Sequence, residues 1–440
     1  MKRGAILVVL LLLLSVPLVG VAQSTIRCRG FLPSRLLIRE RGRRIPGTDN
    51  NLRDQPSADS QKVGEIPGGG VFIVLDGPQC DPEGIAWWQV DYDGLVGWTA
   101  EGLRGTYWLQ PLAPDTDMLT VTNAHRLTLR QVLQSEENVA YSLALRPDGQ
   151  MVALGTGFPD NVIHLWNTTT GTEVAVLTPD YQGDVRALSF NRDGSLLAVG
   201  GLVGDAVQIW AVDTGERIAV LDDSAPLLMF SPVDNRLAYS TGFDLVIWDA
   251  DNRQEVMRWS AGPPSQGLID SMTFSPDGAL LATGDISGFV YLWDVVAGTL
   301  VQRVRHKQTD KTRPVSSVAF NPQGNQLASV NCHQTGDYQG SCLWVKIAVW
   351  NTETGQRHRT LDLTFGEVVD ENLQLAFNTD ETILAVSDSS HLWLVDAWSG
   401  EILHAQSGFR GWQLAISADG RQVLGAGTDA VVQIWEIAGG

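Results

Sequence analysis

Cysteine and histidine are the residues here best suited to metal or nucleophilic chemistry, and only one place in the chain brings them together. Cys332 and His333 are adjacent, and Cys342 follows shortly after. A structural Zn²⁺ site normally needs four ligands, so this set is incomplete, and a disulfide between Cys332 and Cys342 is the better interpretation. The remaining histidines are scattered along the sequence. We therefore predict no metal site.

Motifs for catalysis are also missing from the sequence. The chain has no His-Glu-x-x-His, no Cys-x-x-Cys, no Gly-x-Ser-x-Gly and no phosphate-binding Gly-x-x-x-x-Gly-Lys. Nothing in it points to a cofactor. These observations favour an interaction protein over an enzyme.

The charge balance narrows the class of partner. The 440 residues include 31 basic and 50 acidic side chains, for a formal net charge of −19. Proteins that bind nucleic acid meet its phosphates with an excess of Lys and Arg, so we expect no nucleic-acid partner. Hydrophobic residues make up 44% of the chain, which is enough to form the cores of two or three domains.

The N-terminus has the features of a secretory signal peptide. Lys2 and Arg3 precede an apolar stretch, and small residues stand near Ala22, where a signal peptidase would cut. We predict a cleaved signal over residues 1–22. The alternative is an uncleaved anchor, because the apolar stretch is only just short of a membrane span. Both readings place the rest of the chain outside the cytoplasm, and no later run could cross a bilayer.

A longer pattern organises the C-terminal three hundred residues. An alternating apolar segment ending near a tryptophan occurs seven times, aligned on Trp166, Trp210, Trp248, Trp293, Trp350, Val395 and Trp435. The spacing averages about 40 to 45 residues, as expected for one four-stranded propeller blade. Each copy also carries an earlier apolar strand that ends in a Pro, Asp, Asn or Gly turn. The chain therefore predicts an all-β, seven-bladed β-propeller over residues 121–440, with the tryptophans as fillers between blades.

These copies resemble the WD40 repeat. The Trp-Asp pair is intact at Trp248 and Trp293, whereas the Gly-His pair of the family is missing from most copies. In the family a histidine, an aspartate, a Ser or Thr and the tryptophan form a hydrogen-bonded chain. Asp285, Ser271 and Trp293 match three of these members, so the resemblance implies a partial network. Residues 126–133 resemble the N-terminal strand that closes WD40 rings, and would supply the outer strand that the last copy lacks.

Residues 27–112 carry no copy of this repeat, and from about Asn50 they resemble the bacterial SH3 domain (SH3b). The matching residues are Asn51, Leu52, Arg53, Pro56, Ser57, Gly64, Ile66, Pro67, Gly69, Trp87, Trp88, Val90, Gly97 and Trp98. The resemblance implies a small SH3-like β-barrel, joined to the propeller by a linker at 113–120. The four cysteines then pair within domains, as Cys28–Cys80 and Cys332–Cys342, which fits an oxidising compartment.

Two places are candidates for binding. In the barrel, Trp87, Trp88, Trp98 and Trp108 exceed what a small interior needs. One reading is that two or three of these tryptophans are simply core residues. The other is that the tryptophans not needed in the core line a groove for a cell-wall glycan or a peptide.

The second candidate is a pair of long loops on one face of the fifth blade. Loop 306–316 carries Lys307, Lys311 and Arg313, and loop 331–344 carries Tyr338 and Trp344. A rigid aromatic side chain beside cations suits recognition of a protein partner. The alternative is that both are tolerated surface insertions.

The combined prediction is a secreted or otherwise extracytoplasmic bacterial scaffold. Its propeller would bind a protein partner, while the SH3b module binds envelope glycan or peptide. The main alternative is a hydrolase or lyase with a site in the propeller channel, built from residues far apart in sequence. A third reading gives the SH3b module no ligand and only a role in orienting the propeller.

Overall fold

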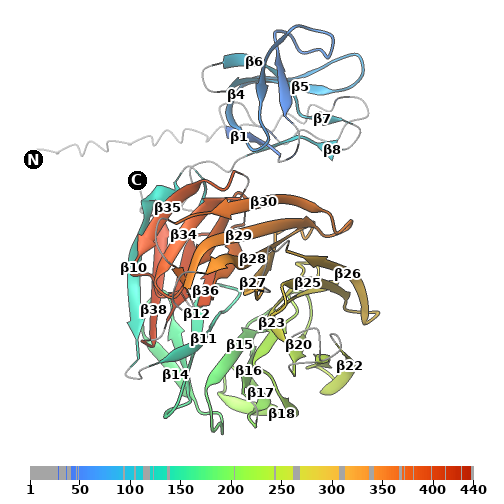
Figure 1. The fold of residues 1–440 in the computed structure, drawn as a ribbon. Helices are drawn as coiled ribbons and strands as arrows, with labels where there is room; N and C mark the ends of the chain where they lie inside the picture. Colours follow the sequence, from blue (N-terminus) through green and yellow to red (C-terminus); the bar gives the residue numbers. More distant parts are fainter. Residues whose placement is uncertain are drawn as a thin grey trace, which may run out of the picture. The chain divides into compact units, whose positions relative to one another are not determined.

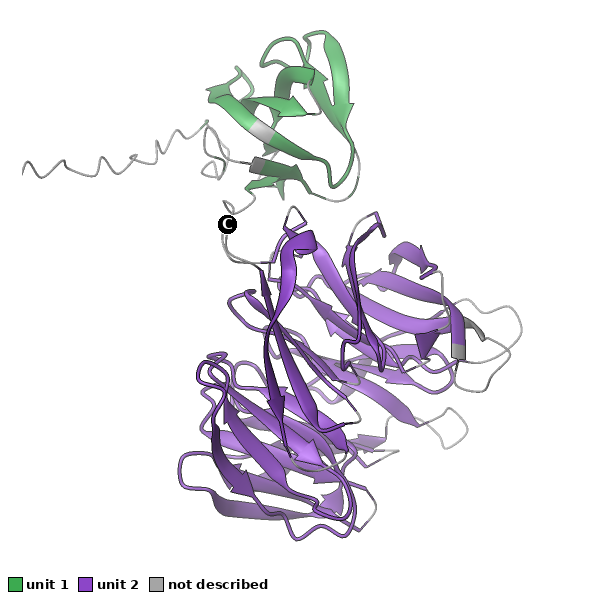
Figure 2. Ribbon diagram, turned by 90° about the vertical axis from the view of Figure 1, so that its left-hand side faces the viewer, with its two compact units in different colours: residues 1–114 green, residues 115–440 purple. Residues whose placement is uncertain are grey.

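The computed structural model describes most of the chain after the predicted signal. The described residues are 28, 36, 41–45, 47 and 49–437, except 93–94, 104–105, 112–118, 122, 136–138, 203, 242–243, 261–267, 307–312, 336–340, 366–368, 371, 380, 398, 412 and 428. The chain divides into two compact units, residues 1–114 and 115–440 (Figure 2). Within these described ranges, no helix is both long and apolar enough to cross a membrane. The predicted signal peptide lies outside them.

Unit 1 is built on one antiparallel sheet with the strand order β3-β2-β6-β5-β4-β1-β9. Its strands are β1 (Arg41–Arg44), β2 (Asn50–Arg53), β3 (Lys62–Ile66), β4 (Val71–Cys80), β5 (Ala86–Tyr92), β6 (Leu95–Ala100) and β9 (Leu109–Pro111). Between β6 and β9 in the sequence, β7 (Gly102–Leu103) and β8 (Thr106–Tyr107) form a separate two-stranded sheet. Alternate residues face a core that includes Leu52, Ile66, Phe72 and Val90, so the predicted small all-β domain is confirmed.

Unit 2 consists, over its described residues, of seven antiparallel sheets (Figure 1). The first three contain β11 (Ala140–Leu145), β12 (Met151–Thr156), β13 (Ile163–Asn167) and β14 (Glu173–Leu177); β15 (Val185–Phe190), β16 (Leu196–Gly201), β17 (Ala206–Ala211) and β18 (Glu216–Ser224); β19 (Leu227–Phe230), β20 (Arg236–Ser240), β21 (Asp244–Asp249) and β22 (Gln254–Ser260).

The next three contain β23 (Ile269–Phe274), β24 (Leu280–Asp285), β25 (Phe289–Asp294) and β26 (Thr299–Arg305); β27 (Ser317–Phe320), β28 (Gln326–Thr335), β29 (Ser341–Asn351) and β30 (Arg357–Leu363), with β31 (Val369–Asp370) paired to β29; β32 (Gln374–Phe377), β33 (Ile383–Ser387), β34 (His391–Asp396) and β35 (Ile402–Ser407). The last contains β36 (Gln413–Ile416), β37 (Gln422–Ala426), β38 (Val431–Ile437) and β10 (Leu127–Gln134), and a 3-10 turn, η1 (Ala124–Arg126), precedes β10.

The first strands of these sheets form a closed ring. Strand β11 contacts β15, and the contacts continue through β19, β23, β27, β32 and β36 back to β11. The seven positions aligned in the sequence all fall on the third strand of their own sheet. Apolar clusters bridge neighbouring sheets, as where Trp210 and Leu197 of one sheet pack with Leu165 of the preceding one. The all-β propeller architecture is confirmed.

Both ends of unit 2 meet in one sheet. Strand β10 pairs antiparallel with β38 from Leu127 opposite Ile437 to Gln134 opposite Val431. Arg130 and Glu436 form an ion pair across this seam, with 2.6 Å between their side-chain atoms. The N-terminal strand thus occupies the outer edge of the last sheet, where β38 would otherwise present unpaired backbone groups.

Hydrogen bonding of the tryptophans depends on one position of the neighbouring second strand. Trp293 Nε1 donates to Thr283 Oγ1 at 3.0 Å, and Trp350 Nε1 donates to Ser329 Oγ at 2.8 Å. Among the described residues, the buried Nε1 atoms of three other aligned tryptophans have no acceptor. The strand register explains this, because the residue in the place of Thr283 is apolar beside each of them: Leu154 beside Trp166, Val199 beside Trp210 and Gly425 beside Trp435.

The partial network expected from Asp285, Ser271 and Trp293 has a different composition. Ser271 lies on the first strand, and its hydroxyl donates to the carbonyl of Val315 at 2.8 Å. Thr283 is the residue that the tryptophan reaches instead. Asp285 accepts a hydrogen bond from the Tyr291 hydroxyl at 3.0 Å. The assignment of Ser271 to the network is therefore corrected to Thr283.

We predict that Trp293→Phe destabilises unit 2 more than Trp210→Phe does. Both substitutions remove a buried indole of similar packing, but only the first leaves a hydroxyl without its donor. The extra loss in the free energy of unfolding should be about 1 kcal/mol. Urea unfolding of the two variants, followed by tryptophan fluorescence, measures the difference. Equal destabilisation would show that the Thr283 bond contributes nothing.

Candidate interaction site on the fifth sheet

The fifth sheet differs from the others in its second and third strands. β28 has 10 residues and β29 has 11, whereas the corresponding strands of the fourth sheet, β24 and β25, have 6 each. The extra length forms a hairpin extension at the end where the two strands are joined. Strand β31 pairs with this extension, Asp370 opposite Ser341 and Val369 opposite Cys342. We call residues 332–335 and 341–345 the extended hairpin.

A disulfide cross-links the two strands of the extended hairpin. Cys332 and Cys342 form the predicted disulfide, with 5.6 Å between their Cα atoms. Both cysteines are buried and pack in one cluster with Val345, Leu363 and Val369. A covalent cross-link and a third paired strand both reduce the backbone freedom of such a segment, so its exposed side chains are held in fixed positions.

A β-bulge directs two apolar residues of the extended hairpin outward. Gln334 lies opposite Trp344 and Thr335 lies opposite Cys342, so Leu343 is the extra residue. Such an insertion interrupts the alternation of side chains and re-aims the neighbours. Leu343 is 37% exposed and Trp344 is 52% exposed, although Val345, next in sequence, is buried. The bulge therefore exposes the indole of Trp344 on a strand that is held by the disulfide and by pairing with β31.

The predicted cationic loop beside this hairpin is described only in part. Arg313 is half-buried. Lys307, Lys311 and Tyr338 lie outside the described residues, so their grouping with Trp344 stays a prediction.

His306, the first residue of the same loop, has a structural role. Its side chain is 1% exposed, and its Nε2 lies 2.7 Å from Ser329 Oγ, which also accepts from Trp350 Nε1. The fifth sheet thus contains the histidine, serine and tryptophan of the hydrogen-bonded chain described for WD40 repeats, whereas the sequence indicated only a partial match in the copy of Trp293. The sequence did not reveal this histidine because the residue before it is Arg305, and not the glycine of the Gly-His pair.

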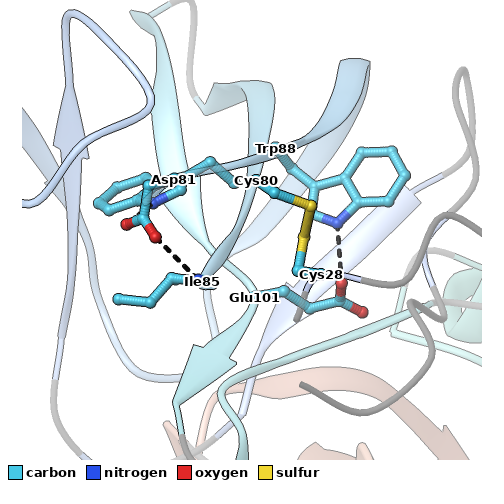
Figure 3. The surroundings of a disulfide bond; sticks show 7 residues. Cys28, Cys80, Asp81, Ile85, Trp88 and Glu101 are labelled. Atoms are coloured by element: carbon cyan, nitrogen blue, oxygen red, sulfur yellow. Dashed lines mark hydrogen bonds between the residues drawn. A yellow bond between two sulfur atoms is a disulfide. The ribbon is translucent and has the colours of Figure 1, made fainter. Parts of the chain in front are cut away.

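The tryptophans proposed for a groove in the barrel are core residues. Trp87, Trp88 and Trp98 are 3%, 2% and 8% exposed. Trp88 Nε1 donates to Glu101 Oε2 at 2.9 Å, beside the Cys28–Cys80 disulfide (Figure 3), and Trp87 Nε1 donates to Asp81 Oδ2 at 2.9 Å. No ring face of these three is open to a ligand, so the prediction of a groove built from them is wrong. For Trp87 and Trp88, the carboxylates of Asp81 and Glu101 satisfy the indole N–H groups, so these rings can be covered.

The ring encloses a cavity of about 500 Å³ lined by the first strands of all the sheets. Among its described lining residues, only Arg186 and Asp270 are charged. Arg186 is engaged with Asp184 at 2.8 Å and lies over the ring of Tyr141 at 4.2 Å. Hydrolases of sugars and many acid–base enzymes place two titratable groups at the reacting bond. The described lining provides one carboxylate, which gives the alternative of a hydrolase or lyase no support.

Comparisons with known proteins agree with the two units. Residues 47–103 match the model of the bacterial SH3 domain, and residues 259–294 match that of the WD domain, G-beta repeat. Periodic tryptophan protein 2 of Arabidopsis thaliana is 28% identical over 306 residues, covering 66% of this chain and 28% of the relative. Anaphase-promoting complex subunit cdc20 of Dictyostelium discoideum is 25% identical over 280 residues, covering 62% and 53%.

A third relative is telomerase protein component 1 of Mus musculus, 28% identical over 258 residues, which cover 57% of this chain and 9% of the relative. The chain thus spans at most about half the length of these three curated relatives.

We predict that the double variant Cys332→Ser/Cys342→Ser loosens the extended hairpin locally. Loss of a cross-link across a short loop should cost about 2 to 3 kcal/mol of local stability. Amide hydrogen exchange should then become faster at residues 342–345, while strand β16 of the second sheet keeps its protection against exchange. The variant Cys28→Ser/Cys80→Ser is the matched control. Unchanged exchange at the hairpin would mean that β31 alone holds it.

Proposed function

Because the chain joins a bacterial SH3 domain to a propeller of WD repeats, we propose that it is an exported, non-enzymatic scaffold that binds a protein partner through the extended hairpin of its fifth sheet. The observation that carries this proposal is Trp344, an indole that is 52% exposed on a strand braced by a disulfide. Tryptophan is enriched among the residues that dominate binding energy, and a fixed backbone lowers the entropy lost on association.

The surroundings of Trp344 favour a protein over a small molecule. Leu343 extends the exposed apolar surface, and Arg313 lies on the segment that leads into the same sheet. Protein interfaces combine such an apolar centre with a polar rim, whereas small molecules are usually enclosed in a concave pocket. Lys307, Lys311 and Tyr338 complete the rim in this proposal.

Two of the relatives support a scaffold role. One is named as a subunit of the anaphase-promoting complex and another as a component of telomerase. Both names describe parts of larger assemblies, and we propose the same kind of role here without carrying over their partners.

The location outside the cytoplasm rests on cysteine usage and the predicted signal. All four cysteines are paired, as Cys28–Cys80 and Cys332–Cys342. Disulfides persist in oxidising compartments and are rare in the cytosol. The match to a bacterial SH3 domain is compatible with a bacterial cell envelope.

A ligand of the barrel is the weaker half of the proposal. With Trp87, Trp88 and Trp98 buried, an envelope glycan or peptide would have to use Trp108, which is half-buried beside them. If the barrel has no such ligand, its role is to orient the propeller.

We predict that a partner can be captured from position 344. A photoreactive amino acid at Trp344 of the secreted chain, irradiated in the native envelope, should cross-link one protein. The same photoreactive residue at Phe158, which is 76% exposed in the turn between β12 and β13, is the matched control. With that partner purified, Trp344→Ala should weaken binding by about 2 kcal/mol, roughly thirtyfold in Kd, because it removes the apolar centre. Phe158→Ala should change nothing.

Equal cross-linking from both positions would contradict the proposal, and so would a Trp344→Ala variant that binds normally.

A further inference from the structure

A second interaction surface, independent of the extended hairpin, lies on the outer strand of the fourth sheet. Arg303 and Arg305 of β26 pair across the sheet with Tyr291 and Phe289 of β25. The guanidinium carbon of Arg303 lies 3.9 Å from the centre of the Phe289 ring, and that of Arg305 lies 4.6 Å from it. One aromatic ring thus holds two exposed arginines.

These two arginines differ from three other arginines on outer strands of the propeller. Arg130, Arg217 and Arg258 each form ion pairs with carboxylates of this strongly acidic protein. Over the described residues, neither Arg303 nor Arg305 forms one. Like charges so close repel, and the ring compensates through cation–π attraction without neutralising either guanidinium group, so both positive charges remain for an acidic partner.

Asp285, a carboxylate whose pKa is influenced by Arg303, forms no ion pair with either arginine over the described residues. Asp285 is buried, and its oxygens accept from the backbone N–H groups of Ser287 and Phe289 and from the hydroxyl of Tyr291. Burial raises the pKa of Asp285, and burial together with Asp285 raises the pKa of Tyr291 to about 12. Tyr291 therefore stays protonated as a donor to Asp285, and the field of Arg303 on Asp285 is only a minor contribution.

Strand β26 also offers its backbone. It is the edge of its sheet, hydrogen-bonded to β25 on one side only within the described residues. Arg303 and Arg305 stand at alternate positions along it, and both are exposed. Alternate residues of a strand are roughly 7 Å apart, and a strand added at the edge would place its own alternate side chains beside them.

We propose that the β26 edge binds an extended, acidic protein segment by strand addition, with carboxylates at alternate positions paired to Arg303 and Arg305. Planar guanidinium groups pair with carboxylates through two parallel hydrogen bonds, and the main chain of the added strand supplies the rest of the affinity. The alternation of charge distinguishes this partner from an anionic polymer.

The test uses the full secreted chain and labelled ten-residue peptides, with binding followed by fluorescence anisotropy. A peptide with Glu at alternate positions should bind at least about tenfold more tightly than one of equal composition with its Glu residues adjacent. Arg303→Gln/Arg305→Gln should lose about tenfold in affinity, and Arg303→Lys/Arg305→Lys should recover only part of it. The matched control is Arg357→Gln on outer strand β30, where the guanidinium carbon lies 6.0 Å from the centre of the Trp350 ring.

A second arm tests the backbone. The alternating peptide with N-methyl groups on the side facing β26 keeps its charges but loses its donors, and should fail to bind. The proposal is overturned if that peptide binds as well as its parent, if neither peptide binds, or if polyphosphate or anionic vesicles compete equally against both spacings. Circular dichroism and the melting temperature confirm that each variant is folded. None of these outcomes depends on the partner of the extended hairpin.

Discussion

Closure of the ring is the constraint on which unit 2 depends. A four-stranded sheet of this composition is apolar on both faces, so it is stable only when a neighbour covers each face. Every sheet has two neighbours only if the last contacts the first, as β36 contacts β11. The pairing of β10 with β38 completes the last sheet from a segment some three hundred residues away. Bringing these two distant segments together costs loop-closure entropy once, and the closed ring then stabilises every interface between sheets.

Given that closure, individual polar contacts inside the sheets can vary. Trp293 and Trp350 donate to a hydroxyl, whereas the N–H groups of Trp166, Trp210 and Trp435 do not, yet the same third-strand position is filled with a large ring. Packing of the ring between sheets contributes more than one hydrogen bond of about 1 kcal/mol. In the sixth sheet Val395 takes the position, and Trp393, two residues earlier on the same face, stacks on Phe365 with 3.8 Å between ring centres. This tolerance explains why the repeats are recognisable by period but weak in detail.

The features readable from the sequence were those set by local alternation and period. The tryptophan spacing marked the third strand of each sheet, and cysteine placement within domains identified both disulfides. The features that could not be predicted from the sequence depend on contacts between residues brought together by the fold. The carboxylates of Asp81 and Glu101 allow Trp87 and Trp88 to be buried, and nothing near either tryptophan in sequence shows this. Likewise the bulge at Leu343 follows from the register between β28 and β29.

The same limit applies to the charged residues. In sequence Arg303 and Arg305 are two of many alternating residues on an outer strand, and only the register of β25 with β26 shows that both reach one phenylalanine. Outer strands are the part of a propeller that ring closure leaves open, and exposed strand edges are commonly protected by charge. A like-charged pair without carboxylate partners repels another copy of the same edge while attracting a strand of opposite charge. Protection against self-association and selection of an acidic partner therefore follow from one arrangement of side chains.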